Sequence, residues 1–84
     1  MRASDTVAKR LLELKDRDAQ NKALYDTFCD RVDELGKQRG TSKASVHGIA
    51  KEMNSFLTAV KKRTGLTWIN PTWADYHTWG VLGL

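Results

Sequence analysis

The spacing of apolar residues constrains the fold of this chain more than any other feature. Steps of four and three residues that begin at Val7 lead through nine positions to Leu35. The nine positions are Val7, Leu11, Leu14, Asp18, Asn21, Tyr25, Phe28, Val32 and Leu35. All but Asp18 and Asn21 are apolar, which is the pattern of an amphipathic helix with one buried face. We therefore predict a helical segment over about residues 5–35, with Ser4 as its N-cap.

The two exceptions, Asp18 and Asn21, fall together in a polar run over residues 15–22. This run allows two interpretations. One long helix has a solvent-exposed middle, or two shorter helices meet there. Because the run contains neither Gly nor Pro, the residues that most often break a helix, we favour one continuous helix.

A second apolar stripe follows the first and is more regular. Its members are Val46, Ile49, Ala50, Met53, Phe56, Leu57 and Val60. It predicts a helix over about residues 43–63, with Thr41 or Ser42 as the N-cap and Gly65 as the left-handed residue after its end. Gly48 inside this stripe indicates a close crossing with the first helix. Gly36 and Gly40 enclose a predicted helix stop and loop, so the two helices form an antiparallel hairpin.

The last 19 residues differ in composition from the rest, because they are rich in aromatic side chains and carry one charge, Asp75. Asn70 followed by Pro71 is typical of a helix start. We predict a short third helix over residues 71–79 that ends at Gly80. The predicted fold is all-α. A single small domain over residues 1–84 contains an antiparallel helical hairpin (about 5–63) and an aromatic C-terminal segment (66–84).

The aromatic segment is the first candidate functional feature. It holds Trp68, Trp73, Tyr76 and Trp79 within twelve residues, and one face of a short helix cannot bury them all. Trp68 and Trp73 suffice to complete the core of the hairpin, and the surplus is free to bind a partner, because Trp and Tyr often anchor interfaces. The predicted partner-binding residues are Trp73, Tyr76, Trp79, Val81, Leu82 and Leu84.

Basic residues are the second candidate feature. The net charge of +4 is concentrated in residues 41–65, which hold five Lys and Arg against Glu52 alone. Together with two residues of the preceding loop, the candidate phosphate-binding set is Lys37, Arg39, Lys43, Lys51, Lys61, Lys62 and Arg63. The competing interpretation is a solvated helix face, on which Glu13, Asp16 and Asp18 neutralise the last three cations.

Residues with catalytic chemistry are few. The chain has two histidines, His47 and His77, and one cysteine, Cys29, and no nucleophile–base pair or metal-ligand spacing connects them. We interpret His47 as a surface side chain, His77 as packed among aromatic rings, and Cys29 as a small buried residue beside Phe28. We predict no enzyme activity, no cofactor, no metal and no small-molecule substrate.

We predict that the protein is located in the cytoplasm. A single cysteine cannot form an internal disulfide, which favours a reducing compartment. No apolar run follows the N-terminus, so a signal peptide is not expected. No stretch reaches the roughly 18 apolar residues that span a membrane. The leading hypothesis is an assembly or adaptor subunit that binds a protein partner or a second copy, as small accessory proteins of large complexes or virus particles do. The alternative is a small basic protein that binds a nucleic acid such as DNA, and the third hypothesis is an inhibitor that occludes a partner's site.

Overall fold

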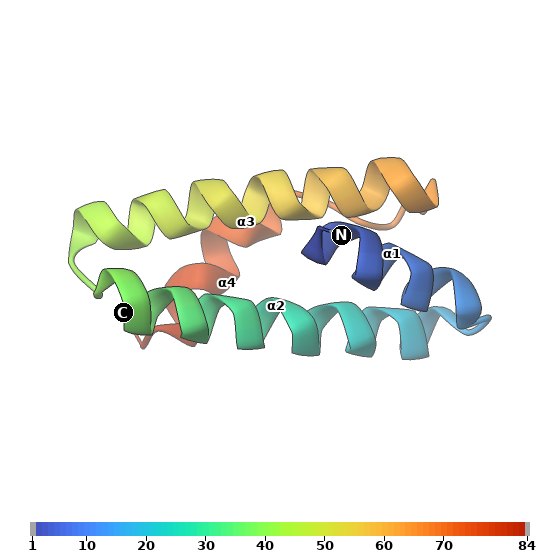
Figure 1. Cartoon of the computed structure of the whole chain (residues 1–84), viewed down its shortest axis with the longest axis horizontal. Helices are drawn as coiled ribbons and strands as arrows, with labels where there is room; N and C mark the ends of the chain where they lie inside the picture. Colours follow the sequence, from blue (N-terminus) through green and yellow to red (C-terminus); the bar gives the residue numbers. More distant parts are fainter. Residues whose placement is uncertain (1, 84) are drawn as a thin grey trace.

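The computed structural model describes residues 2–83, and within that range it contains four helices and no strand. The helices are α1 (Ala3–Glu13), α2 (Arg17–Arg39), α3 (Lys43–Thr64) and α4 (Trp73–Val81). Helices α2 and α3 run antiparallel along the long axis of a molecule measuring 38 × 25 × 17 Å (Figure 1). The predicted all-α fold, with a hairpin and a short aromatic helix, is confirmed.

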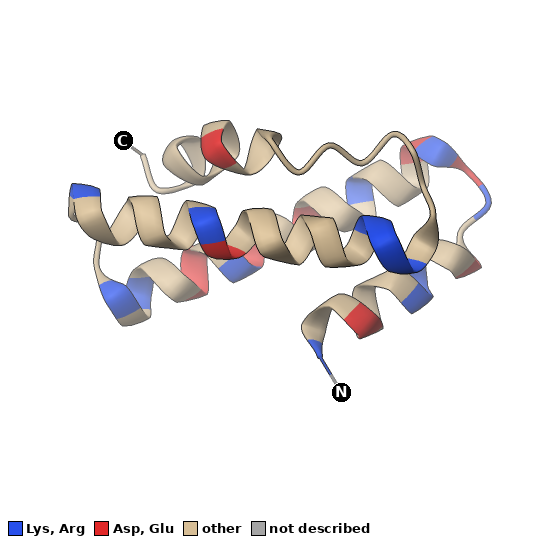
Figure 2. Ribbon diagram, turned by 90° about the horizontal axis from the view of Figure 1, so that it is seen from above, with Lys and Arg blue, Asp and Glu red and all other residues tan. Residues whose placement is uncertain are grey.

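The two short helices pack at opposite ends of the α2–α3 hairpin. Figure 1 shows α1 between α2 and α3 at one end of the long axis and α4 toward the other end. In the view from above, α1 and α4 lie on opposite sides of α3 (Figure 2). Each short helix therefore contacts both long helices, and within residues 2–83 the two short helices do not contact each other.

The preference for one continuous first helix is wrong, because the chain leaves the helix at residues 14–16. The Asp16 carboxylate accepts a hydrogen bond from the Ala19 N–H at 3.1 Å and so acts as the N-cap of α2. The Gln20 side-chain amide, which is buried, donates to the carbonyl oxygens of Leu11 (3.0 Å) and Leu14 (2.8 Å). Polar side chains thus satisfy the backbone groups at the break, and neither Gly nor Pro is needed there.

Because of the break, α1 packs against the α2–α3 hairpin and contributes its own buried residues to the core. The residues of the buried cluster come from all four helices and from the α3–α4 connection. They are Val7, Leu11, Leu24, Phe28, Val32, Ile49, Met53, Phe56, Leu57, Val60, Ile69 and Ala74. Every member of the second apolar stripe is buried, as its spacing predicted.

The glycines near the hairpin loop differ from the prediction in two places. Gly36 lies inside α2 rather than at a helix stop, and the helix ends at Gly40, which has a φ of +84°. A side chain is unfavourable at Gly36 because a Cβ there would lie 2.6 Å from Leu82 Cδ2. A Cβ added at Gly48 would lie 3.3 Å from a guanidinium nitrogen of Arg39. Gly48 thus faces this side chain and not, as was predicted, the backbone of a crossing helix. The predicted left-handed residue Gly65, with φ +71°, ends α3.

Helix α4 starts and ends two residues later than predicted. Asn70 Oδ1 accepts hydrogen bonds from the Thr72 N–H (3.1 Å) and hydroxyl (2.8 Å), so a turn precedes the helix. At the other end Gly80 keeps a negative φ and the helix continues to Val81, while Gly83 has a φ of +75°.

Candidate functional site

One side of α4 is fixed to the rest of the protein by aromatic packing. The Trp73 ring lies 5.0 Å from the Phe28 ring and 6.0 Å from the Tyr25 ring, measured between centroids. His77 stands edge-on to Trp73 at 5.0 Å, and its Nδ1 is 3.5 Å from the Tyr25 hydroxyl oxygen. The prediction that His77 packs among aromatic rings is confirmed. Trp73 and His77 therefore hold α4 against α2.

The inward face of α4 is completed by Ala74 and Thr78, which are fully buried. Val81 and Leu82 at the end of the helix also pack against the core, and Leu82 lies on Gly36. Three of the predicted partner-binding residues, Trp73 and these two, thus have contacts within the chain. Leu84, the last of the predicted set, lies outside the described residues.

The opposite side of α4 carries the two remaining members of the predicted set. Tyr76 is 85% exposed, the highest exposure of any large apolar side chain among the described residues. Trp79, one turn further on, is half-buried and is not among the residues packed against the core. Together with Asp75 they line a shallow groove of about 340 Å³. We call Asp75, Tyr76 and Trp79 the α4 surface.

The basic residues predicted from sequence do not form one surface. Figure 2 shows Lys and Arg at both ends and in the middle of α3, a helix of 22 residues. Such a helix is about 33 Å long, so its two ends cannot contact the same small ligand. Lys37, Arg39 and Lys43 lie at the hairpin-loop end, whereas Lys61, Lys62 and Arg63 lie at the other end and Lys51 lies between them.

Three of these seven cations are paired with carboxylates. Lys37 Nζ lies 3.1 Å from Asp33, and Arg39 lies 3.0 Å from Glu52. Arg63 pairs with Asp5 of α1, rather than with Glu13, Asp16 or Asp18 as predicted. The reason is the break after Glu13, which turns α1 so that its first turn, and not the polar run, faces the end of α3.

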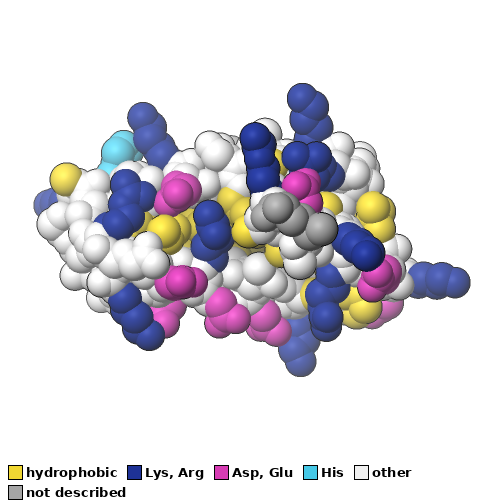
Figure 3. Space-filling model, viewed as in Figure 1, with side chains coloured by type: hydrophobic (Ala, Val, Ile, Leu, Met, Phe, Trp, Pro, Cys, Tyr) yellow, Lys and Arg dark blue, Asp and Glu magenta, His cyan; other side chains and the backbone are white. Residues whose placement is uncertain are grey.

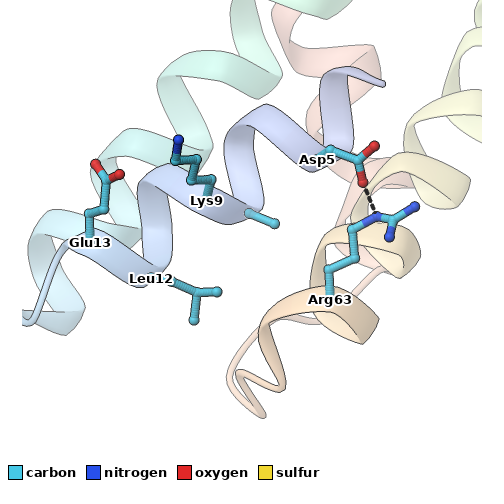
Figure 4. A pocket seen from close by; sticks show the side chains of 6 residues that line it. Asp5, Lys9, Leu12, Glu13 and Arg63 are labelled. Atoms are coloured by element: carbon cyan, nitrogen blue, oxygen red, sulfur yellow. Dashed lines mark ion pairs between the residues drawn. The ribbon is translucent and has the colours of Figure 1, made fainter. Parts of the chain in front are cut away.

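A hollow of about 540 Å³ lies between α1 and the end of α3. Figure 4 shows the Asp5–Arg63 ion pair at its edge, with Leu12 pointing away from Lys9 and Glu13. Its lining residues are Asp5, Ala8, Lys9, Leu12, Glu13 and Arg63. None of these is a histidine or a cysteine, and within residues 2–83 no group of three His, Cys, Asp or Glu side chains is placed to hold a metal ion.

Cys29 is half-buried in α2, and its surroundings determine its reactivity. Burial raises the pKa of the Cys29 thiol above its ordinary value of 9.0; hydrogen bonding with Tyr25 opposes the shift, and the charges of Asp26 and Asp30 add to it. Because the thiolate is the reactive form, a raised pKa lowers the reactive fraction at neutral pH.

We therefore expect iodoacetamide to alkylate Cys29 in the folded protein more slowly at pH 7.5 than in the urea-unfolded chain. We also expect the rate to keep rising with pH beyond 9.0, the ordinary pKa of the thiol. The measurement is the alkylation rate by mass spectrometry from pH 7 to 10.5. A rate that levels off below pH 8.5 would contradict the assigned environment.

Comparisons with protein-family models, with curated proteins and with solved structures found no match for this chain. Among the described residues, no helix is at once long and apolar enough to cross a membrane.

Two groups of surface residues were not predicted from the sequence. Asp75 lines the groove beside Tyr76 and Trp79. Trp79 lies four residues after Asp75 and three after Tyr76, and these spacings place it on the same side of the helix as both. That signal is present in the sequence. Arg2 and Arg31, by contrast, line a common hollow although they belong to different parts of the chain, and no local pattern indicates their proximity.

Proposed function

We propose that this protein is a non-enzymatic docking subunit that binds a protein partner through the α4 surface. The observation that carries the proposal is the 85% exposure of Tyr76 beside the half-buried Trp79, on a helix whose other face is packed into the core. Large aromatic side chains left exposed in this way are enriched among the residues that dominate interface energetics.

The α4 surface is held in a fixed orientation before any partner arrives. Ala74 and Thr78 are fully buried, and the Trp73 ring contacts Phe28. A partner therefore binds a helix that is already formed, and the conformational entropy lost on binding is small. This rigidity supports docking by the folded protein rather than folding on binding.

Charge indicates the chemistry of the partner. The chain has a net charge of +4, and residues 66–84 contain Asp75 as their only charge, so the rest of the chain carries +5. Figure 2 shows this segment without a Lys or Arg and with a single acidic residue on α4. A partner segment with an Arg or Lys beside apolar residues fits this surface, because the cation can stack on Tyr76 or Trp79 and pair with Asp75.

The test is a selection of random displayed peptides on the immobilised protein, followed by affinity measurements on the selected sequences. We expect the selected peptides to contain Arg or Lys beside apolar residues. The double variant Tyr76→Ala/Trp79→Ala is expected to bind them at least about 30-fold more weakly, since interface hot spots contribute about 2 kcal/mol or more.

The matched control is Leu12→Ala, which removes an apolar side chain that is 58% exposed on α1, far from α4. This variant is expected to bind the selected peptides as tightly as the original protein. Circular dichroism confirms that each variant is folded. Peptides that bind the double variant undiminished, or a selection that enriches no such sequence, would refute docking through the α4 surface.

A further inference from the structure

A second surface collects basic side chains from three parts of the fold. Arg2 precedes α1, Arg31 lies on α2, and Lys62 and Arg63 lie in the last turn of α3. These four residues, which we call the basic surface, line two hollows of about 430 and 420 Å³ that share Arg2 and Ala59. Figure 3 shows several Lys and Arg side chains over α1 and the adjoining part of α3, with acidic side chains among them.

The acidic groups near the basic surface are already engaged. Asp5 pairs with Arg63, and Glu52, which lines the first hollow, pairs with Arg39. Within residues 2–83 no carboxylate forms an ion pair with Arg2, Arg31 or Lys62. The surface therefore keeps an excess of positive charge that the chain itself does not neutralise.

Arg31 is held in place by an aromatic ring. Its guanidinium lies over the Phe56 ring, 5.5 Å from the centroid, and its Nε is buried without a hydrogen-bond acceptor. The ring fixes the position of the charge at the wall of the first hollow, so an anion that binds there loses little additional side-chain entropy. The first turn of α1, whose N-terminal end carries a partial positive charge, lines the same hollow through Ala3 and Ser4.

We infer that the basic surface binds the phosphate backbone of a nucleic acid. Phe56, which lies under Arg31, and Arg63 are seven residues apart on α3, a separation of about 10 Å. The cations of the basic surface are thus spread along α3 rather than gathered at one point. Phosphates of one strand succeed each other about every 3.4 Å along the axis of a duplex, so a row of about four phosphates covers this distance. The Ser55 side chain, exposed at the first hollow, adds a neutral donor of the kind that contacts phosphates.

This surface differs from the basic set predicted from sequence and is separate from the α4 surface. It takes Lys62 and Arg63 from that set, adds Arg2 and Arg31, and leaves the cations at the hairpin-loop end aside. No residue of α4 lines either hollow. Phosphate binding is therefore independent of protein docking, and each can fail without the other.

The test measures binding to a fluorescent 20-base-pair DNA duplex of random sequence, and to an RNA strand of the same length, over a series of KCl concentrations. The variant is Arg31→Gln/Lys62→Gln. Because each lost phosphate contact reduces the steepness of log K against log salt by about 0.9 for duplex DNA, we expect this variant to reduce it by about 1.8 on the duplex. Lys62→Gln alone, at an exposed position, is expected to reduce it by about half as much.

The matched control is Lys37→Gln/Lys43→Gln, which makes the same change in net charge at the hairpin-loop end, where α2 ends and α3 begins. It is expected to leave the slope unchanged, as is Tyr76→Ala/Trp79→Ala. An equal loss of slope in the control, or no measurable duplex or RNA binding, would overturn the inference. Tighter binding to poly-glutamate than to either nucleic acid, or competition by millimolar inorganic phosphate alone, would also overturn it in favour of an acidic protein segment or a single-phosphate site.

Discussion

Replacement of Phe28 by alanine is expected to lower the free energy of unfolding by about 3–5 kcal/mol, the cost of truncating a buried Phe in a packed core. Phe28 has no exposed surface. The centroid of its ring lies 5.0 Å from that of Trp73 on α4. The total stability of a chain of 84 residues is on the order of 5 kcal/mol, so the variant loses most of it. Urea unfolding followed by circular dichroism at 222 nm measures the change.

The control for this prediction is again Leu12→Ala, whose side chain is 58% exposed, and its expected change is within about 0.5 kcal/mol. A Phe28→Ala protein that unfolds at nearly the urea concentration of the original would show that α4 does not close the core over α2. The orientation of the α4 surface would then have no structural support.

Replacement of Gln20 by glutamate is expected to destabilise the protein by about 1–3 kcal/mol. The substitution removes both donors to the carbonyl oxygens of Leu11 and Leu14 and places a carboxylate against them in a buried position. Because these bonds close the C-terminal end of α1, the effect falls first on that helix. Hydrogen–deuterium exchange is expected to accelerate in α1 more than in the α2–α3 hairpin.

The matched control is Gln38→Glu, the same chemical change at an exposed position near the end of α2. It is expected to leave both the stability and the exchange of α1 unchanged. If Gln20→Glu exchanges and unfolds like this control, the Gln20 amide does not hold the joint between α1 and α2, and another interaction must account for the turn.

The two apolar stripes show where periodicity predicts the fold and where it fails. The second stripe is unbroken, and all its residues are buried in a single helix. The first stripe predicts helix correctly on both sides of residues 14–16 but does not reveal the break, since apolar spacing resumes in register beyond it. The signal for the break is polar: Asp16 is an N-cap, and Gln20 reaches back to α1.

The positions of Gly36 and the C-terminal residues depend on tertiary contacts that no local pattern contains. A glycine after a helical run is typical of a helix end, yet Gly36 lies within α2 and is covered by Leu82. The same contact explains why Leu82 packs against the core. Prediction of its burial requires knowing how α4 crosses α2.

The candidate sites divide in the same way. The exposure of Tyr76 and Trp79 can be predicted from sequence spacing, because a short helix cannot bury all of its aromatic rings on one face. The basic surface cannot be predicted in this way. Arg2, Arg31 and Arg63 come together only because the helix breaks at residues 14–16 and α1 packs against α3.

The most direct test of docking through α4 is the response of the indole N–H signals in a ¹H–¹⁵N NMR spectrum when a selected Arg-containing peptide is added. Variants with each Trp replaced by Phe assign the three signals. The Trp68 Nε1 is buried, whereas Trp79 lines the groove, so we predict that the Trp79 signal shifts while the Trp68 signal does not. A bound peptide that leaves the Trp79 signal in place would contradict docking at this surface.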